Sequence, residues 1–211
     1  MKIGIIGSGN VGGTLGKRWA KNGHTVTFSS RNPDSDEMRK LIADSGASAK
    51  SASVKEAVEQ SDIILLATPW PATKDAVANA GSLSGRILID ATNPLLPDLS
   101  GLEIGNTTSG AELVAQWAPG AKVVKAFNTV GYNIMADPNL NGQAALLYYC
   151  GDQTESKEVV NNLAKELGFD PQDAGPLKQA RLLEPFALLW ISLAFTEGHG
   201  REFAFRTINR K

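Results

Sequence analysis

Residues 2–12, with the sequence KIGIIGSGNVG, decide how the start of this chain folds. An apolar run leads into glycines at positions 7, 9 and 12, and an amphipathic segment then leads to a second strand-like run at 25–28. Gly7 permits a tight turn, Gly9 lets the backbone approach a pyrophosphate, and Gly12 lets the helix pack closely on the strand. The pattern predicts a βαβ unit that binds a dinucleotide at the amino end of its helix.

The residues that follow the second strand indicate which dinucleotide is bound. An NAD site usually has Asp or Glu there to accept a hydrogen bond from the ribose 2′-hydroxyl, whereas this chain reads Ser29-Ser30-Arg31-Asn32. Arg31 offers a bidentate fork for a 2′-phosphate and Ser30 a further hydroxyl donor, so we expect NADP(H). The alternative is that Arg31 is an ordinary solvated loop residue.

The composition favours small-molecule partners. The 211 residues are 42% hydrophobic and 20% charged, with a formal net charge of −1 and no long basic run. We therefore expect one principal domain, with neither nucleic acid nor a membrane as partner. The single cysteine, Cys150, lies in an apolar run and predicts a buried thiol in a reducing, cytoplasmic setting. Because a strand begins at residue 2, we expect a protein that is not exported.

Strands and helices alternate along the rest of the chain. We expect helices at 35–45, 53–60, 73–80, 109–117, 155–167 and 176–198, and strands at 47–50, 62–67, 86–89, 122–126, 144–150 and around 169. The fold class is therefore α/β, a Rossmann-type doubly wound, mostly parallel sheet with a small helical C-terminal extension. Residues 1–175 would form the nucleotide-binding domain, and 176–211 a helical segment with an edge strand at 203–205.

The apolar segment 186–195 lies within this extension. It is shorter than the about 20 residues that a membrane-spanning helix needs. Pro185 either kinks the helix or starts its second half. We interpret the segment as a helix that is buried in the fold or between two copies, and we expect a homodimer.

Ligands of open parallel sheets bind beyond the carboxyl ends of the strands, so the loops there are the candidate acceptor site. These loops are 68–71, 90–95 and 127–132, and they offer amides, hydroxyls and aromatic rings but few ionisable groups. Reduction of a carbonyl needs a proton relay, for which His24, His199 and Lys125 are poorly placed candidates. A flavin or deazaflavin ring needs mainly positioning, and Trp70 offers either a wall for such a ring or a core residue.

Several motifs together resemble a known family. They are IGSGNVG at 6–12, SR at 30–31, TPW at 68–70, VKAFNT at 124–129, CGD at 150–152, DAGPL at 173–177 and RLLEP at 181–185. Over nearly the whole chain the sequence resembles NADPH-dependent coenzyme F420 reductases (NADP oxidoreductase, coenzyme F420-dependent). It is also similar to the cytosolic NADPH domain of STEAP-type ferrireductases.

The resemblance implies direct hydride transfer between nicotinamide C4 and C5 of a deazaflavin, with no catalytic side chain and no metal. It implies phosphate contacts from Ser8, Gly9, Asn10 and Val11, and places Trp70, Gly131 and Tyr132 near the nicotinamide. With Gly7, Gly12, Ser30, Arg31, Thr68, Pro69, Asn93 and Asn128, these form the expected cofactor site. Asn128 and Thr129 are candidate positioning residues. Asn128 stands where characterised deazaflavin reductases have histidine, and the 92–95 loop also differs from theirs.

Other functions fit parts of this pattern. A free flavin, a quinone or a ferric chelate is an alternative acceptor. An imine or keto-acid reductase would use Lys125 as proton donor. A sensor would bind NADP(H) without turning it over.

The 2′-phosphate assignment makes a first prediction. Removal of one charge-assisted contact costs about 1.5 to 3 kcal/mol, so Arg31→Ala should weaken NADPH binding roughly 10- to 150-fold. NADH has no 2′-phosphate, and its affinity should hardly change. Titration of both nucleotides by protein fluorescence measures the two effects. An equal loss for NADH and NADPH would contradict the assignment.

Overall fold

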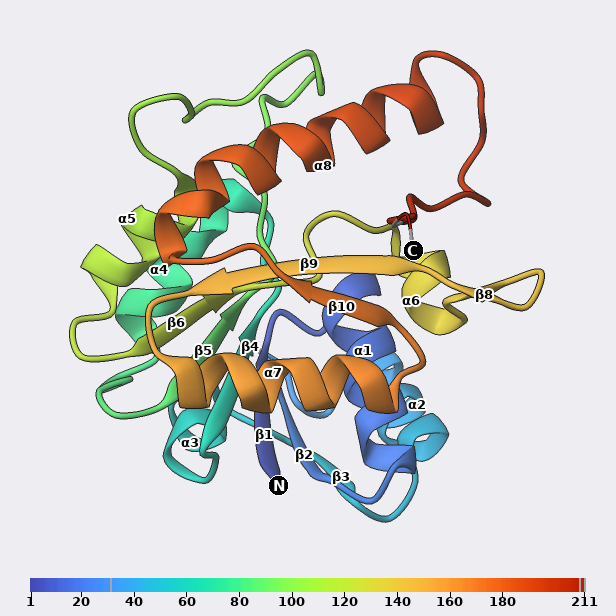
Figure 1. Ribbon diagram of the computed structural model, residues 1–211. Helices are drawn as coiled ribbons and strands as arrows, with labels where there is room; N and C mark the ends of the chain where they lie inside the picture. The colour runs from blue at the N-terminus through green and yellow to red at the C-terminus, as the bar shows by residue number, and fades with distance from the viewer. Residues whose placement is uncertain (31, 209, 211) are drawn as a thin grey trace.

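The computed structural model describes residues 1–30, 32–208 and 210 and contains an eight-stranded sheet with helices on both faces (Figure 1). The strands are β1 (Lys2–Ile6), β2 (Thr25–Ser29), β3 (Ala49–Ala52), β4 (Ile63–Leu66), β5 (Ile87–Asp90), β6 (Lys122–Lys125), β9 (Leu146–Gly151) and β10 (Asp170–Asp173). Their order is β10-β9-β6-β5-β4-β1-β2-β3. Only the β6–β9 pair in this sheet is antiparallel, so the predicted fold class is confirmed.

The helices match the predicted segments within a few residues. They are α1 (Asn10–Lys21), α2 (Asp36–Ser45), α3 (Val54–Glu59), α4 (Trp70–Asn79), α5 (Gly110–Trp117), α6 (Tyr132–Ala136), α7 (Thr154–Glu166) and α8 (Ala180–Phe195), with a 3₁₀ turn η1 (Leu177–Gln179). The predicted helix at 73–80 begins earlier, at Trp70, because Pro71 fits the first turn of a helix. Two short features were not predicted, namely α6 and a hairpin of β7 (Asn139–Leu140) and β8 (Gln143–Ala144).

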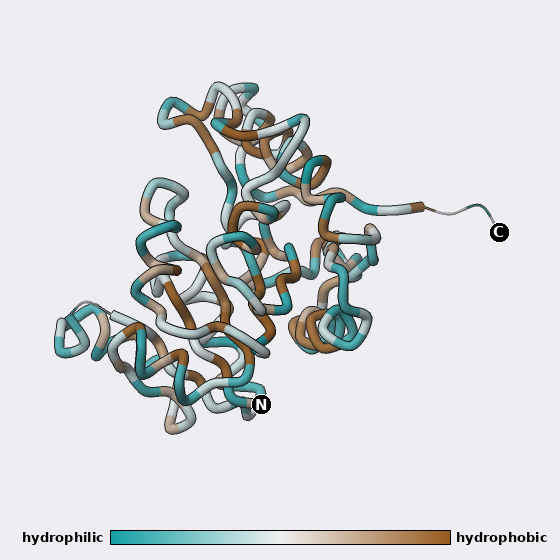
Figure 2. Tube along the Cα trace, turned by 90° about the vertical axis from the view of Figure 1, so that its left-hand side faces the viewer, coloured by the Kyte–Doolittle hydropathy of each residue, from teal (hydrophilic) through white to brown (hydrophobic). Residues whose placement is uncertain are grey.

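The central strands alternate their side chains between two hydrophobic cores. Ile5 and Leu65 enter the core beneath α1, α2, α6 and α7, whereas Leu66 and Leu88 enter the core beneath α3, α4, α5 and α8. Figure 2 shows several hydrophobic segments, in brown, at the middle of the molecule. Continuous apolar strands thus bury both faces of the sheet, as a parallel sheet requires.

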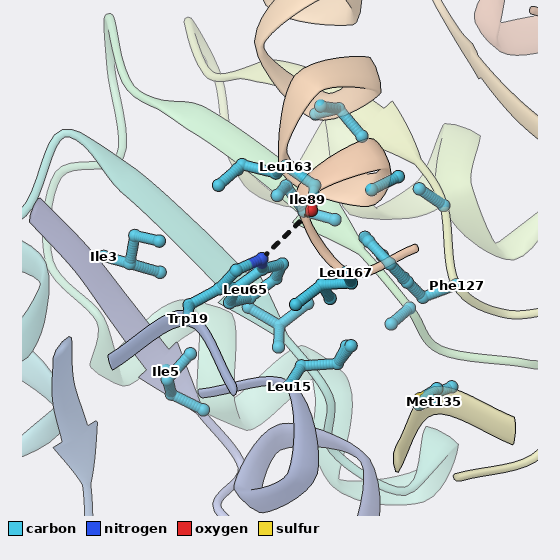
Figure 3. Close-up of a cluster of buried hydrophobic side chains, with 14 of the residues drawn as sticks. Ile3, Ile5, Leu15, Trp19, Leu65, Ile89, Phe127, Met135, Leu163 and Leu167 are labelled. Atoms are coloured by element: carbon cyan, nitrogen blue, oxygen red, sulfur yellow. Dashed lines mark hydrogen bonds between the residues drawn. The ribbon is translucent and has the colours of Figure 1, made fainter. Parts of the chain in front are cut away.

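Trp19 is the centre of the first core. Its ring is fully buried and lies edge-on to Phe127, with ring centroids 5.7 Å apart. Its Nε1 donates a hydrogen bond to the Leu163 carbonyl oxygen at 3.3 Å, which joins α1 to α7 (Figure 3). A buried Trp with its N–H paired in this way fixes the position of both helices on the sheet.

The C-terminal segment consists of α8 and a tail that folds back on it. Pro185 lies inside α8 rather than at a helix start. Beyond the helix, Phe203 stacks on Trp190 at 5.3 Å and Phe205 packs on Phe186 at 4.6 Å. The edge strand predicted at 203–205 is wrong, because these residues make one backbone hydrogen bond, from Leu146 N to Phe205 O, and no ladder. In the part of the chain that is described, no helix is long and apolar enough to cross a membrane.

Lys125 carries a fully buried charge at the end of β6. Its Nζ lies 2.9 Å from Asp90 Oδ2 and 2.8 Å from Glu184 Oε1. The third hydrogen bond goes to the Thr92 carbonyl oxygen at 2.7 Å, so all three ammonium donors are used. Burial alone would lower the pKa of Lys125, but the two carboxylates outweigh burial and raise that pKa above its usual value. The side chain therefore stays charged.

Glu184 extends this network to α5. Its Oε2 accepts a hydrogen bond from Gly110 N at 2.9 Å, and its Oε1 accepts one from Ala111 N at 3.1 Å. Two backbone donors at the amino end of α5 are thereby satisfied by a side chain of α8. The network of Asp90, Lys125 and Glu184 thus ties the C-terminal helix to β5, β6 and α5.

Removal of the central cation should be far more costly than removal of a surface one. Lys125→Met leaves two buried carboxylates facing each other and should lower the free energy of unfolding by about 3 to 5 kcal/mol. Lys55, which is exposed and pairs with Glu59 at 3.9 Å, provides the control. Lys55→Met should cost less than about 1 kcal/mol. Urea unfolding of both variants measures the difference, and similar costs would contradict a structural role for Lys125.

Candidate functional site

The amino end of α1 is open to a ligand. Gly9 is its N-cap, and no side chain among the described residues caps the helix. Serine side chains cap α2, α3 and α5, whereas α4, α6, α7 and α8 resemble α1 in having no side-chain cap among the described residues. A Cβ atom added to Gly9 would have no heavy atom within 4 Å, so the space in front of the free N–H groups is open. Free amides at a helix amino end bind phosphate well.

The two other glycines of the motif serve packing. Gly7 has a φ of +94°, and a Cβ there would lie 2.6 Å from the Ala67 carbonyl oxygen. A Cβ on Gly12 would lie 2.0 Å from the Gly7 carbonyl oxygen. The turn after β1 therefore touches the loop after β4 at one side and α1 at the other. Only Gly9 has room for a ligand in front of it.

A cavity of about 510 Å³ lies beside this turn, between α1 and α2. Four of the residues that the sequence predicted line it: Ser8, Gly9, Asn10 and Ser30. The cavity wall also includes residues that the sequence interpretation missed: Gly13, Thr14 and Lys17 from α1, and Ser35, Glu37, Met38 and Leu41 from the α2 region. Positions 10, 13, 14 and 17 share one helix face, so helical spacing could have identified Lys17. Arg31 lies outside the described residues.

The loops after β5 and β6 are joined by a pair of asparagines. Asn93 Nδ2 donates to the Asn128 carbonyl oxygen at 2.9 Å, and Asn128 Nδ2 donates to Asn93 Oδ1 at 3.1 Å. Asn128 Oδ1 is buried and has no partner among the described residues. The preceding residue, Phe127, is buried with a φ of +65°, which is costly for a bulky side chain. Packing of Phe127 in the core thus imposes the turn that presents Asn128 and the buried Thr129.

The remaining residues predicted for the site differ in how deeply their side chains are buried and in what they contact. Trp70 is 7% exposed, and its ring packs on Trp117 with centroids 5.5 Å apart, so it belongs to the core. Gly131 lies against Trp190, because an added Cβ would be 2.5 Å from that ring. Tyr132 begins α6 and is half-buried. The loop after β4 holds itself in place, with Thr73 Oγ1 donating to the Pro69 carbonyl oxygen at 3.1 Å and lying 3.0 Å from Thr68 Oγ1.

Two of the three proton-relay candidates, Lys125 and His24, are held by other side chains. Lys125 is fully committed to its acceptors. His24 is buried rather than on the surface, and its Nε2 lies 2.7 Å from Glu166 Oε2, before β2 and away from the loops of the site. His199 lies in the tail, with its ring 6.1 Å from that of Phe203. Burial raises the pKa of the Cys150 thiol to about 12, as expected for an inert core thiol.

Comparison with known proteins identifies relatives of this chain. The family described as "NADP oxidoreductase coenzyme F420-dependent" matches residues 2–94. A metalloreductase of Rattus norvegicus, STEAP3, is 32% identical over 188 residues, which cover 89% of this chain and 36% of that protein. The chain thus spans about a third of the length of this curated relative.

Solved structures show the same fold. A putative F420-dependent NADP reductase from Arthrobacter sp. FB24 superposes with a TM-score of 0.90 at 29% identity, over 99% of this chain and 100% of that one. A reductive aminase from Aspergillus terreus, solved with NADPH, superposes with a TM-score of 0.68 at 22% identity, over 93% of this chain and 62% of that one. At 22% identity, the likeness to the reductive aminase shows a shared fold and nothing more.

The different surroundings of Gly9 and Gly12 make a paired prediction. Gly9→Ala places a methyl group in open space and should cost less than about 1 kcal/mol of stability, but the methyl group should obstruct a phosphate and weaken NADPH binding about tenfold or more. Gly12→Ala forces a backbone clash and should cost about 2 kcal/mol or more. Thermal unfolding and NADPH titration separate the two effects. A Gly9→Ala variant with unchanged NADPH affinity would rule out the phosphate contact.

Proposed function

We propose that this chain, whose residues 2–94 match the family of coenzyme F420-dependent NADP oxidoreductases, passes hydride from NADPH to a deazaflavin or flavin-like ring. The observation that carries the proposal is the open amino end of α1 beside a cavity that contains Lys17 and Ser30. A helix end that no side chain caps, next to a cation and hydroxyl donors, suits a phosphorylated dinucleotide.

The residues present fit NADP(H). The amides at Asn10 and Val11 would bind the pyrophosphate, because they begin α1 without a cap. Ser30 and Arg31 would bind the 2′-phosphate. Ser8 would keep the turn in place, since its Oγ donates to the Ser29 carbonyl oxygen at 3.1 Å. The neighbouring cavity wall of Met38 and Leu41 supplies the apolar surface that an adenine ring needs.

The acceptor end of the site consists of neutral groups held in fixed positions. The bound rings would supply hydride transfer, in which two electrons and one proton leave nicotinamide C4 and a second proton comes from water. The protein's part is to hold two planar rings face to face. Asn93 and Asn128 connect the loops after β5 and β6, and Lys125 fixes Thr92 beside them. This rigidity suits positioning, and it needs no side chain to move a proton.

Two other functions are weaker candidates. A Lys125-dependent imine or keto-acid reductase is disfavoured, because all three donors of the ammonium are occupied and the side chain is fully buried. A reductase of a ferric chelate finds support in the likeness to the metalloreductase STEAP3. The cytoplasmic location and the homodimer expected from α8 stay predictions.

The proposal is tested by NADPH oxidation at 340 nm with a deazaflavin, FMN and a ferric chelate supplied in parallel. Saturable turnover with the deazaflavin, with slower turnover of FMN and none of the ferric chelate, is the expected result. Turnover of the chelate alone would replace the ring acceptor by a ferrireductase-like one. Tight NADPH binding without turnover of any acceptor would identify a sensor and overturn the proposal.

A further inference from the structure

The C-terminal tail brings an arginine to the edge of the acceptor loops. The Arg201 guanidinium carbon lies 4.3 Å from the centroid of the Tyr132 ring and 5.9 Å from that of Phe195. Tyr132 begins α6 directly after the loop that follows β6. A guanidinium stacked on an aromatic ring is a preorganised cation, unlike a freely rotating surface arginine.

Contacts on both sides of Arg201 keep the tail in this place. Asn133 Nδ2 donates to the Arg201 carbonyl oxygen at 2.6 Å and lies 3.0 Å from Glu202 Oε1. Trp190 Nε1 donates to the Phe203 carbonyl oxygen at 3.0 Å. Because Trp190 also touches Gly131, α8, the tail and the loop after β6 pack as one unit.

The donors of Arg201 are largely unused. Within residues 1–30, 32–208 and 210, no carboxylate oxygen lies within 4.0 Å of its guanidinium. Among these residues, the guanidinium makes one weak hydrogen bond, from its Nη2 to Asn133 Oδ1 at 3.5 Å. The adjacent carboxylate of Glu202 contacts Asn133 instead. A stacked guanidinium leaves its in-plane N–H edge free, and that edge matches the geometry of a phosphate or carboxylate.

We propose that Arg201 binds an anionic group, phosphate or carboxylate, on the side chain of the acceptor whose ring lies against the loops after β4, β5 and β6. This inference rests on the proposed hydride transfer and names the class of its acceptor. The proposed nucleotide site has its own cation, Lys17, which lines the cavity between α1 and α2. An anion at Arg201 therefore belongs to the second substrate, and the tail acts as a specificity element.

FMN and riboflavin test the proposal, because they share one ring and differ only in the phosphate. The wild-type protein should prefer FMN in kcat/KM about tenfold, and Arg201→Gln should bring the ratio near one. The KM for NADPH should stay within about twofold. Fluorescence quenching of the two flavins by NADP⁺-loaded protein should show the same ratio in affinity, so the test does not depend on turnover.

Matched variants separate charge from folding. Arg206→Gln removes the same charge from an exposed position of the tail and should keep the preference for FMN. Glu202→Gln keeps the acceptor for Asn133 but removes a nearby negative charge, and should raise the preference about twofold. In the wild-type protein, the preference should fall when NaCl rises from about 0.01 to 0.3 M, because salt screens exposed charges.

Three results would overturn the inference. The first is a wild-type protein that does not distinguish FMN from riboflavin. The second is an Arg201→Gln variant that keeps the full preference for FMN. The third is an Arg201→Gln variant that binds NADPH more weakly and leaves the preference for FMN unchanged. An Arg201-dependent affinity for FMN, in a protein that turns over neither FMN nor a deazaflavin, would support the anion site while overturning the proposed hydride transfer. The two proposals therefore fail in distinguishable ways.

Discussion

A buried ammonium must be surrounded by acceptors, and this requirement at Lys125 fixes where distant parts of the chain meet. Asp90 lies at the end of β5, the strand next to β6, and Glu184 lies on α8, the last helix. Their convergence holds the 92–94 loop through the Thr92 carbonyl oxygen and caps α5 through Glu184. The same charge network therefore sets the position of α8 and of the loop after β5, which we propose faces the acceptor.

The nucleotide half of the molecule could be inferred from sequence because its signals are local. The glycines of residues 7–12 and the apolar runs determine the conformation of residues close to them in the sequence. The structure confirms the predicted turn, helix and parallel sheet. Lys17 was not predicted as a site residue, although it lies on the same helix face as Asn10. Its proposed contact with the nucleotide depends on α2, which forms the opposite wall of the cavity.

The other half could not be inferred because its determinants act between distant residues. A single sequence does not reveal that Lys125 meets Glu184, or that the tail packs on α8 through Phe203 and Trp190 instead of joining the sheet. The five-residue helix α6 is too short for a periodic pattern. It follows the left-handed turn at Phe127, which is stabilised by core packing and not by local preference.

The two edges of the sheet limit how this molecule can aggregate. The outer strand β10 reads Asp170-Pro171-Gln172-Asp173, and the opposite edge, β3, carries the exposed Lys50. A proline cannot donate to an incoming strand, and charges at an edge repel another chain that approaches it. The apolar central strands, which would readily form intermolecular cross-β contacts, are thus shielded on both sides by edges that resist extension of the sheet.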